Sequence, residues 1–191
     1  MASMISTVIK RAREVRWQPY WDRQVIAAAG TFNTDVSFFQ VVRTNAILGN
    51  MQSAGQFPYP KQFWITGVSC FLQNCAGAAQ ASIGMLELTV QNLMAVTTFS
   101  FEMGDKKYLQ VPLFMLGAAG GSYAGALPTS AIAAQLGWPT CGNYYRVKPS
   151  LKIPSQQNFI AKLLVGNVTV TVAAADSATI VLHGYEERAV Q

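Results

Sequence analysis

QFWITGVSCF, residues 62–71, is the stretch of sequence that decides the fold. Side chains of a β-strand point alternately to the two faces of its sheet. Such alternation would make both faces of this stretch largely apolar. One face would carry Phe63, Ile65 and Gly67, and the other would carry Trp64, Thr66, Val68 and Cys70. The pattern therefore predicts a central strand that is covered on both sides.

Stretches with strand character recur on either side of it, separated by turn residues. The other predicted strands are 36–42, 83–90, 96–103, 108–114, 144–153, 158–165, 168–173 and 179–187. Gly104-Asp105-Lys106 is predicted as a turn, Gly166-Asn167 as a compact hairpin turn, and Asp176-Ser177 as a break between the last two strands. Connections of helical length are missing between these strands, which argues against a parallel α/β sheet.

Eight or nine strands in 191 residues predict an all-β fold, an antiparallel β-sandwich of the single jelly-roll kind over residues 25–191. An immunoglobulin-like sandwich is the alternative, although that fold is shorter and its loops are more even in length. The excursion at 117–139 is rich in glycine and alanine, and 129–136 within it is predicted as one or two helical turns. It lacks the motifs of phosphate-binding loops, so we expect a packing surface between subunits.

Residues 1–24 are predicted to form a basic amphipathic arm with a short helix. Apolar residues recur there at helical spacing, namely Ile5, Val8, Ile9, Ala12 and Val15. Residues 1–23 carry five basic and two acidic side chains, whereas the remainder of the chain is nearly neutral. We expect this arm to contact a neighbouring subunit, lipid or nucleic acid. The contact residues would be Lys10, Arg11, Arg13, Arg16, Trp17, Tyr20 and Trp21.

The composition favours an assembled protein. Hydrophobic residues make up 51% of the chain and charged residues 12%, about half the roughly 25% of ordinary soluble domains. The chain is long enough to bury a core and too hydrophobic to be disordered. No apolar stretch reaches the ~20 residues that a membrane-spanning helix needs, and no signal peptide is recognised. The cysteines, Cys70, Cys75 and Cys141, are interpreted as buried, reduced thiols of a protein made in a cytosol.

Residues with catalytic potential are few. His183 is the single histidine, so the several histidines of a metal-binding cupin are missing, and we interpret it as a structural residue. Glu186 and Glu187 are adjacent in a predicted strand and would point to opposite faces, which is unlike a glycosidase pair. No local signature supports a Cys–His dyad. We therefore expect a protein that is not an enzyme, with no catalytic residue, cofactor or metal.

Several segments carry a resemblance to a known group of proteins. They are SFFQV at 37–41, TN at 44–45, AGQFPYP at 54–60, FWITGV at 63–68 and VLHGYEER at 181–188. In strand and turn style they resemble single jelly-roll structural proteins of bacterial viruses, notably the capsid proteins of tailless icosahedral phages with an internal membrane.

The resemblance implies a subunit that builds an icosahedral shell through its loops and its N-terminal arm. It also implies synthesis in the host cytoplasm, location in the virion, and partners that are copies of itself and other capsid proteins. Residues 1–23 would face internal membrane lipid, packaged nucleic acid or a neighbour.

Two other functions remain open. One is a receptor- or carbohydrate-binding trimeric head of a phage fibre, or a lectin-like module, with Trp138, Tyr144 and Tyr145 as sugar-binding aromatics. The other is a membrane-active sandwich that inserts its N-terminal helix.

Overall fold

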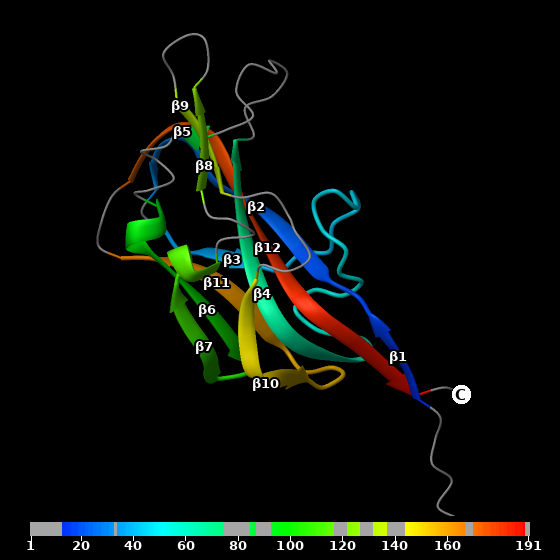
Figure 1. Ribbon diagram of the computed structural model, residues 1–191. Helices are drawn as coiled ribbons and strands as arrows, with labels where there is room; N and C mark the ends of the chain where they lie inside the picture. The colour runs from blue at the N-terminus through cyan, green and yellow to red at the C-terminus, as the bar shows by residue number, and fades with distance from the viewer. Residues whose placement is uncertain are drawn as a thin grey trace, which may run out of the picture.

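The computed structural model describes residues 13–32, 34–74, 85–86, 93–116, 122–126, 132–136, 144–166 and 170–189. Two antiparallel sheets pack face to face (Figure 1). The first sheet contains β1 (Arg13–Trp17), β2 (Tyr20–Phe32), β4 (Gln62–Asn74), β10 (Tyr145–Ile153) and β12 (Val170–Ala189). The second contains β3 (Val36–Phe38), β6 (Thr97–Met103), β7 (Lys106–Pro112) and β11 (Phe159–Val165). The predicted all-β, antiparallel β-sandwich is confirmed.

A third, small sheet contains β5 (Met85–Leu86), β8 (Ser122–Ala126) and β9 (Ile132–Leu136). It lies at the opposite end of the molecule from β1 (Figure 1). The predicted helical turns at 129–136 are wrong where the structure describes this segment, because 132–136 pairs with β8 along its whole length. That pairing satisfies the backbone hydrogen bonds of an alanine-rich segment whose local propensity favours a helix.

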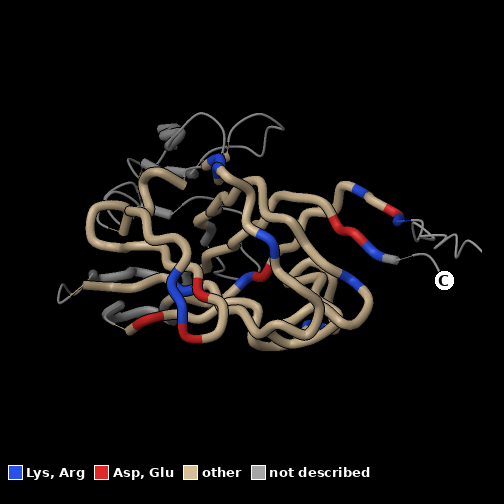
Figure 2. Tube along the Cα trace, turned by 90° about the horizontal axis from the view of Figure 1, so that it is seen from below, with Lys and Arg blue, Asp and Glu red and all other residues tan. Residues whose placement is uncertain are grey.

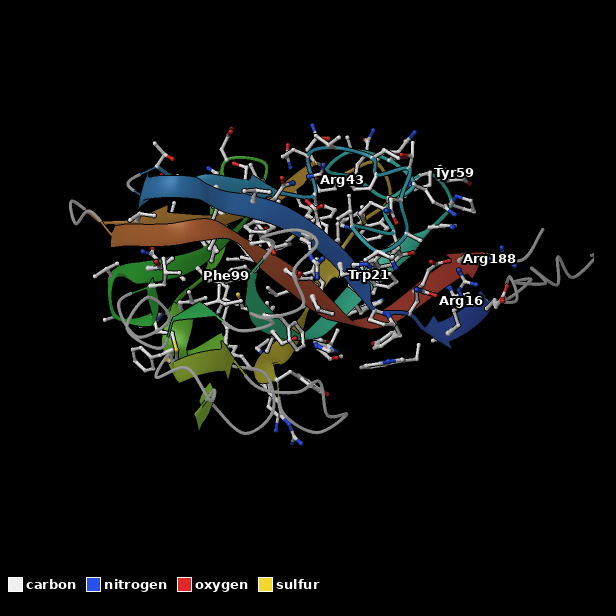
Figure 3. The ribbon with its side chains drawn as sticks, turned by 90° about the horizontal axis from the view of Figure 1, so that it is seen from above. Arg16, Trp21, Arg43, Tyr59, Phe99 and Arg188 are labelled. Carbon is white, nitrogen blue, oxygen red and sulfur yellow. The ribbon has the colours of Figure 1, made fainter. Side chains whose placement is uncertain are left out.

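The core is aromatic. Phe38, Phe63, Phe99 and Phe101 are fully buried between the two large sheets, and Figure 3 shows Phe99 in the interior. The Tyr20 ring meets the Phe63 ring edge to face, with their centroids 5.1 Å apart. Such edge-to-face pairs add to the free energy gained by burying the rings.

Strand β4 lies between β12 and β10, which confirms the central strand predicted from residues 62–71. The predicted division of its faces is correct only as far as Ile65. Between His183 and Gly184 of β12 the register shifts, so that Thr66 is an extra residue in β4. This bulge turns Val68 and Cys70 to the core side, the side that Phe63 faces.

Strand β12 is one strand of 20 residues, where the sequence predicted two. The predicted break at Asp176-Ser177 is a register shift against β2, and the strand continues through it. The predicted hairpin at Gly166-Asn167 is wrong, because β11 pairs with β3 and β6 while β12 belongs to the other sheet.

The turn predicted at Gly104-Asp105-Lys106 is confirmed between β6 and β7, with Gly104 at φ +56. The strand predicted at 108–114 ends at Pro112 and is followed by a 3-10 helix, Leu113–Leu116. The strand predicted at 36–42 ends at Phe38, because Phe39 has a positive φ of 65. No helix in the described part of the chain is long and apolar enough to span a membrane.

The predicted N-terminal helix is wrong for residues 13–17, which form β1 and pair with the end of β12. The cross-strand partners explain the strand, because Glu14 pairs with Arg188 and Arg16 with Glu186 on one face of β1. Residues 1–12 lie outside the described residues. Residues 20–24 lie inside β2, so the first sheet begins well before residue 25.

Candidate assembly surface

The structure describes five of the seven predicted contact residues. Arg13, Arg16 and Trp17 lie in β1, Tyr20 and Trp21 begin β2, and Lys10 and Arg11 lie outside the described residues. Trp17 is 56% exposed and Tyr20 only 5% exposed. Trp17 is therefore free to contact another molecule, whereas Tyr20 belongs to the core of its own subunit.

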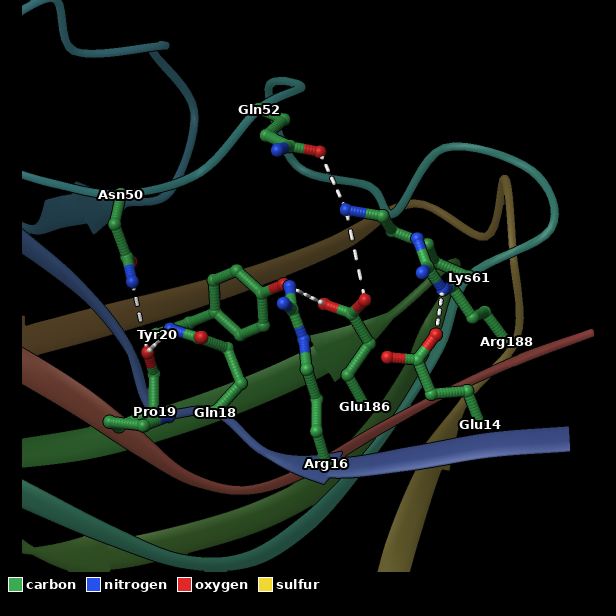
Figure 4. A network of polar contacts seen from close by, with 10 residues as sticks. All are labelled: Glu14, Arg16, Gln18, Pro19, Tyr20, Asn50, Gln52, Lys61, Glu186 and Arg188. Carbon is green, nitrogen blue, oxygen red and sulfur yellow. Dashed lines mark hydrogen bonds and ion pairs between the residues drawn. The ribbon is translucent and has the colours of Figure 1, made fainter. Parts of the chain in front are cut away.

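A buried carboxylate anchors β1 and β2 to the end of β12 (Figure 4). Glu186 accepts a hydrogen bond from the Tyr20 hydroxyl at 2.5 Å, and its carboxylate lies 3.5 Å from Arg16 Nη2 and 3.7 Å from Lys61 Nζ. A buried carboxylate is tolerated only when it is paired in this way. Burial, and then the hydrogen bond to Glu186, raise the pKa of Tyr20 well above its ordinary value, so the hydroxyl remains a donor.

The neighbouring carboxylate, Glu187, lies on the opposite face of β12, as the sequence predicted. It accepts a hydrogen bond from Trp64 Nε1 at 3.0 Å and pairs with Arg13. These two hydrogen bonds hold its pKa below the ordinary value for a glutamate. On the Glu186 face, Arg188 Nε lies 2.5 Å from Glu14 Oε2. Figure 2 shows acidic and basic positions side by side at this end of the molecule.

On the outer face of the first sheet, four side chains form a row across β1, β12, β4 and β10. In register they are Trp17, Tyr185, Trp64 and Lys152. The Trp64 and Tyr185 rings stack with centroids 5.9 Å apart, and Lys152 Nζ lies 5.2 Å from the Trp64 ring centroid. The sequence alone does not reveal this row, because its members come from four distant segments. Their only shared sequence signal is an outward position in an alternating strand.

The edge of the first sheet that β1 and β2 form is covered at the start of β2 and open beside β1. The loop before β4 lies along β2, where Arg23 N donates to Leu48 O at 2.7 Å and Asn50 N to Trp21 O at 3.3 Å. Trp21 also donates from Nε1 to Ala46 O, so it holds this loop of its own subunit. In the described part of the chain no segment pairs with the outer edge of β1. An open edge of this kind is a template for another strand.

A second buried carboxylate, that of Asp22, contacts the loop between β3 and β4. Asp22 is 2% exposed and accepts a hydrogen bond from the backbone N–H of Phe39 at 2.7 Å. Arg43 Nε lies 3.3 Å from the same carboxylate. The loop therefore belongs to the folded subunit and protects the edge at the start of β2.

The histidine, the candidate sugar-binding aromatic residues and the cysteines that the structure describes make contacts within the subunit. His183 Nε2 is hydrogen-bonded to Ser69 Oγ at 2.8 Å, its ring stacks on Tyr144, and burial lowers its pKa. Tyr145 packs against the core, and Trp138 lies outside the described residues. Burial raises the pKa of Cys70 to about 12, which keeps this free thiol protonated. Cys75 and Cys141 also lie outside the described residues.

Within the described ranges, no three His, Cys, Asp or Glu side chains are grouped as metal ligands would be. No known protein-family model matches the sequence, and no curated protein is significantly similar to it. The surface around β1 is therefore the candidate functional site.

Proposed function

We propose that this chain is a single jelly-roll structural protein of a virus particle, a capsid or capsid-associated subunit. The strand pairing supports the jelly roll. Apart from β1 and the small sheet, the described residues form eight strands that follow one another along the chain. Among them the first pairs with the last, the second with the seventh, the third with the sixth and the fourth with the fifth, as β2·β12, β3·β11, β4·β10 and β6·β7. A long hairpin wrapped into two sheets has this order.

Jelly rolls also serve as lectins and cupins, so the choice of function depends on the surface and not on the fold. The observation that carries the proposal is β1. Val15 is 59% exposed and Trp17 is 56% exposed, and both lie on an open sheet edge near the chain terminus. Exposed apolar side chains on an open edge favour pairing with another chain. Together with the low charge content, this arrangement favours a subunit that is completed by its neighbours.

The expected partners follow from the same surface. Copies of this chain or other capsid proteins would cover Val15 and Trp17. Lys10 and Arg11, which precede β1 in the sequence, remain candidates for contact with membrane lipid or packaged nucleic acid.

Sedimentation velocity of the full-length protein and of Trp17→Ser tests the proposal. If each copy buries Trp17 in an interface, its loss removes roughly 1.5–3 kcal/mol per site. We expect the wild type to form large particles and Trp17→Ser to sediment mainly as free subunits with an unchanged melting temperature. A Trp17→Ser protein that assembles like the wild type would contradict the role of β1.

The aromatic row favours a second function, a carbohydrate-binding head. Trp17, Tyr185 and Trp64 place three aromatic rings side by side on the outer face of the first sheet, and sugar-binding sites often use exposed aromatic rings. This alternative predicts that the protein forms a small oligomer and not a shell. The oligomer would bind glycans, and Trp64→Ala would abolish that binding.

A further inference from the structure

The backbone of β1 presents hydrogen-bonding groups to its open side at alternate residues. Gln18 N donates to Gly184 O at 3.1 Å, just beyond the last residue pair of the β1–β12 ladder, Trp17 and Tyr185. In an antiparallel ladder, residues that bond to the partner strand alternate with residues whose N–H and C=O point away from it. Arg13, Val15 and Trp17 therefore direct their N–H and C=O groups outward.

The β1 sequence, REVRW at 13–17, is complementary to itself when it runs antiparallel about Val15. In that register Val15 faces Val15 of a second copy, and each Arg13 faces Trp17 of the other copy. Each Glu14 faces Arg16 of the other copy, which places opposite charges across the junction. Opposite charges and cation–aromatic pairs on adjacent strands are favourable.

We propose that two copies of this chain pair antiparallel through β1, about a twofold axis at Val15, and so join their first sheets into one continuous sheet. This inference deepens the proposed assembly function and rests on it. Such an interface is isologous, because the same strand is used on both sides. Strand addition at an open edge supplies main-chain hydrogen bonds, and the side chains select the register.

The outward groups allow few registers. Within β1 only the odd-numbered residues can form main-chain hydrogen bonds to the second copy. The twofold axis of the strand pair can therefore shift along β1 only in steps of one residue. Moving it to Glu14 places the two Glu14 side chains opposite each other, and moving it to Arg16 does the same for Arg16. Like charges directly opposite are destabilising. The register centred on Val15 avoids both.

Cysteine cross-linking tests the register. Directly opposed residues that bond to each other have Cα atoms about 5.5 Å apart, a separation that a disulfide bridges. In a chain carrying Cys75→Ser and Cys141→Ser, we expect V15C to form a disulfide dimer under mild oxidation. The matched control is V25C, since Val25 is 57% exposed but lies in β2. Cross-linking of V15C no faster than that of V25C would overturn the proposal.

Proline substitution tests the pairing without relying on cysteine chemistry. Proline lacks an N–H and is tolerated on an edge strand where that N–H faces solvent. V15P should therefore keep the melting temperature of the wild type while losing the β1-mediated dimer. By contrast, R16P removes a main-chain hydrogen bond from β1 to β12 and should destabilise the subunit itself.

The outcomes separate this inference from the proposed function. If large particles form but V15P leaves them unchanged and V15C fails to cross-link, the β1 pairing is wrong and another surface drives assembly. If the wild type remains a single subunit at every concentration, both the pairing and the capsid function are wrong.

Discussion

Tyr20 and Glu186 make the contact that ties the start of β2 to the last part of β12. The hydroxyl of Tyr20 donates to a carboxylate that is 1% exposed, and Arg16 and Lys61 approach the same carboxylate. A hydrogen bond to a buried charge contributes about 1.5–3 kcal/mol. The start of β2 is therefore part of the folded body, and a truncation that removed residues 1–23 would remove core residues with the N-terminal segment.

Replacing Tyr20 with phenylalanine should lower the free energy of unfolding by about 2 kcal/mol, because Glu186 loses its closest donor. Tyr59→Phe is the matched control, since Tyr59 is 67% exposed and should change stability by less than about 0.5 kcal/mol. Urea denaturation monitored by tryptophan fluorescence measures both values. Equal effects of the two substitutions would show that the Glu186 contact does not stabilise the fold.

His183 should make stability depend on pH below about 6.5, the ordinary histidine pKa. Burial lowers its pKa in the folded protein, so the unfolded chain binds the proton first as the pH falls. The free energy of unfolding should therefore decrease from pH 6.5 toward pH 5. The contributions of Glu102 and Glu187, whose pKa values are lowered, should be lost only below about pH 4.3.

His183→Gln should flatten this pH dependence between pH 6.5 and 5 while keeping a hydrogen-bonding group near Ser69. Thermal melts at half-unit pH steps measure it. Because His183 is the single histidine, an unchanged slope in His183→Gln would show that another group causes it.

At the scale of elements, β12 depends on its close approach to β4. A Cβ atom placed on Gly184 would lie 1.9 Å from the backbone oxygen of Trp64. This contact lies beside the bulge that re-aims the core residues of β4. The two central strands of the first sheet therefore fit together only with glycine at this position.

Gly184→Ala should lower the free energy of unfolding by about 3 kcal/mol, the upper end of the usual cost of overpacking, because the opposing atom is backbone. Gly166→Ala is the control, since its Cβ would have no neighbour closer than 3.8 Å. Chemical denaturation of the two variants compares them directly. A loss at Gly184 no larger than that at Gly166 would contradict the close packing of β12 on β4.

The sequence predicted elements whose signals are local. Alternation over residues 62–71 identified a central strand, and Gly104-Asp105 identified the turn between β6 and β7. It did not predict the bulge at Thr66, because that residue is extra only relative to β12, more than 100 positions away. The N-terminal helix failed over 13–17 for the same reason, since the partners of Glu14 and Arg16 are Arg188 and Glu186. The aromatic row likewise exists only after four strands have paired.

At the scale of the whole molecule, the strand pairing brings β1 and the end of β12 together at one end of the sandwich. The tube in Figure 2 shows β1 beside the end of β12, and Figure 3 shows Arg16 and Arg188 at that end, away from Phe99 in the core. The open β1 edge and the aromatic row lie there as well. The central claim is that this end is completed by other copies of the chain.

Electron microscopy of the purified full-length protein tests that claim most directly. We expect closed particles of uniform diameter, much larger than a 20.7 kDa subunit. A field that contains only isolated subunits or small rings, at concentrations at which the folded state is verified by circular dichroism, would contradict it.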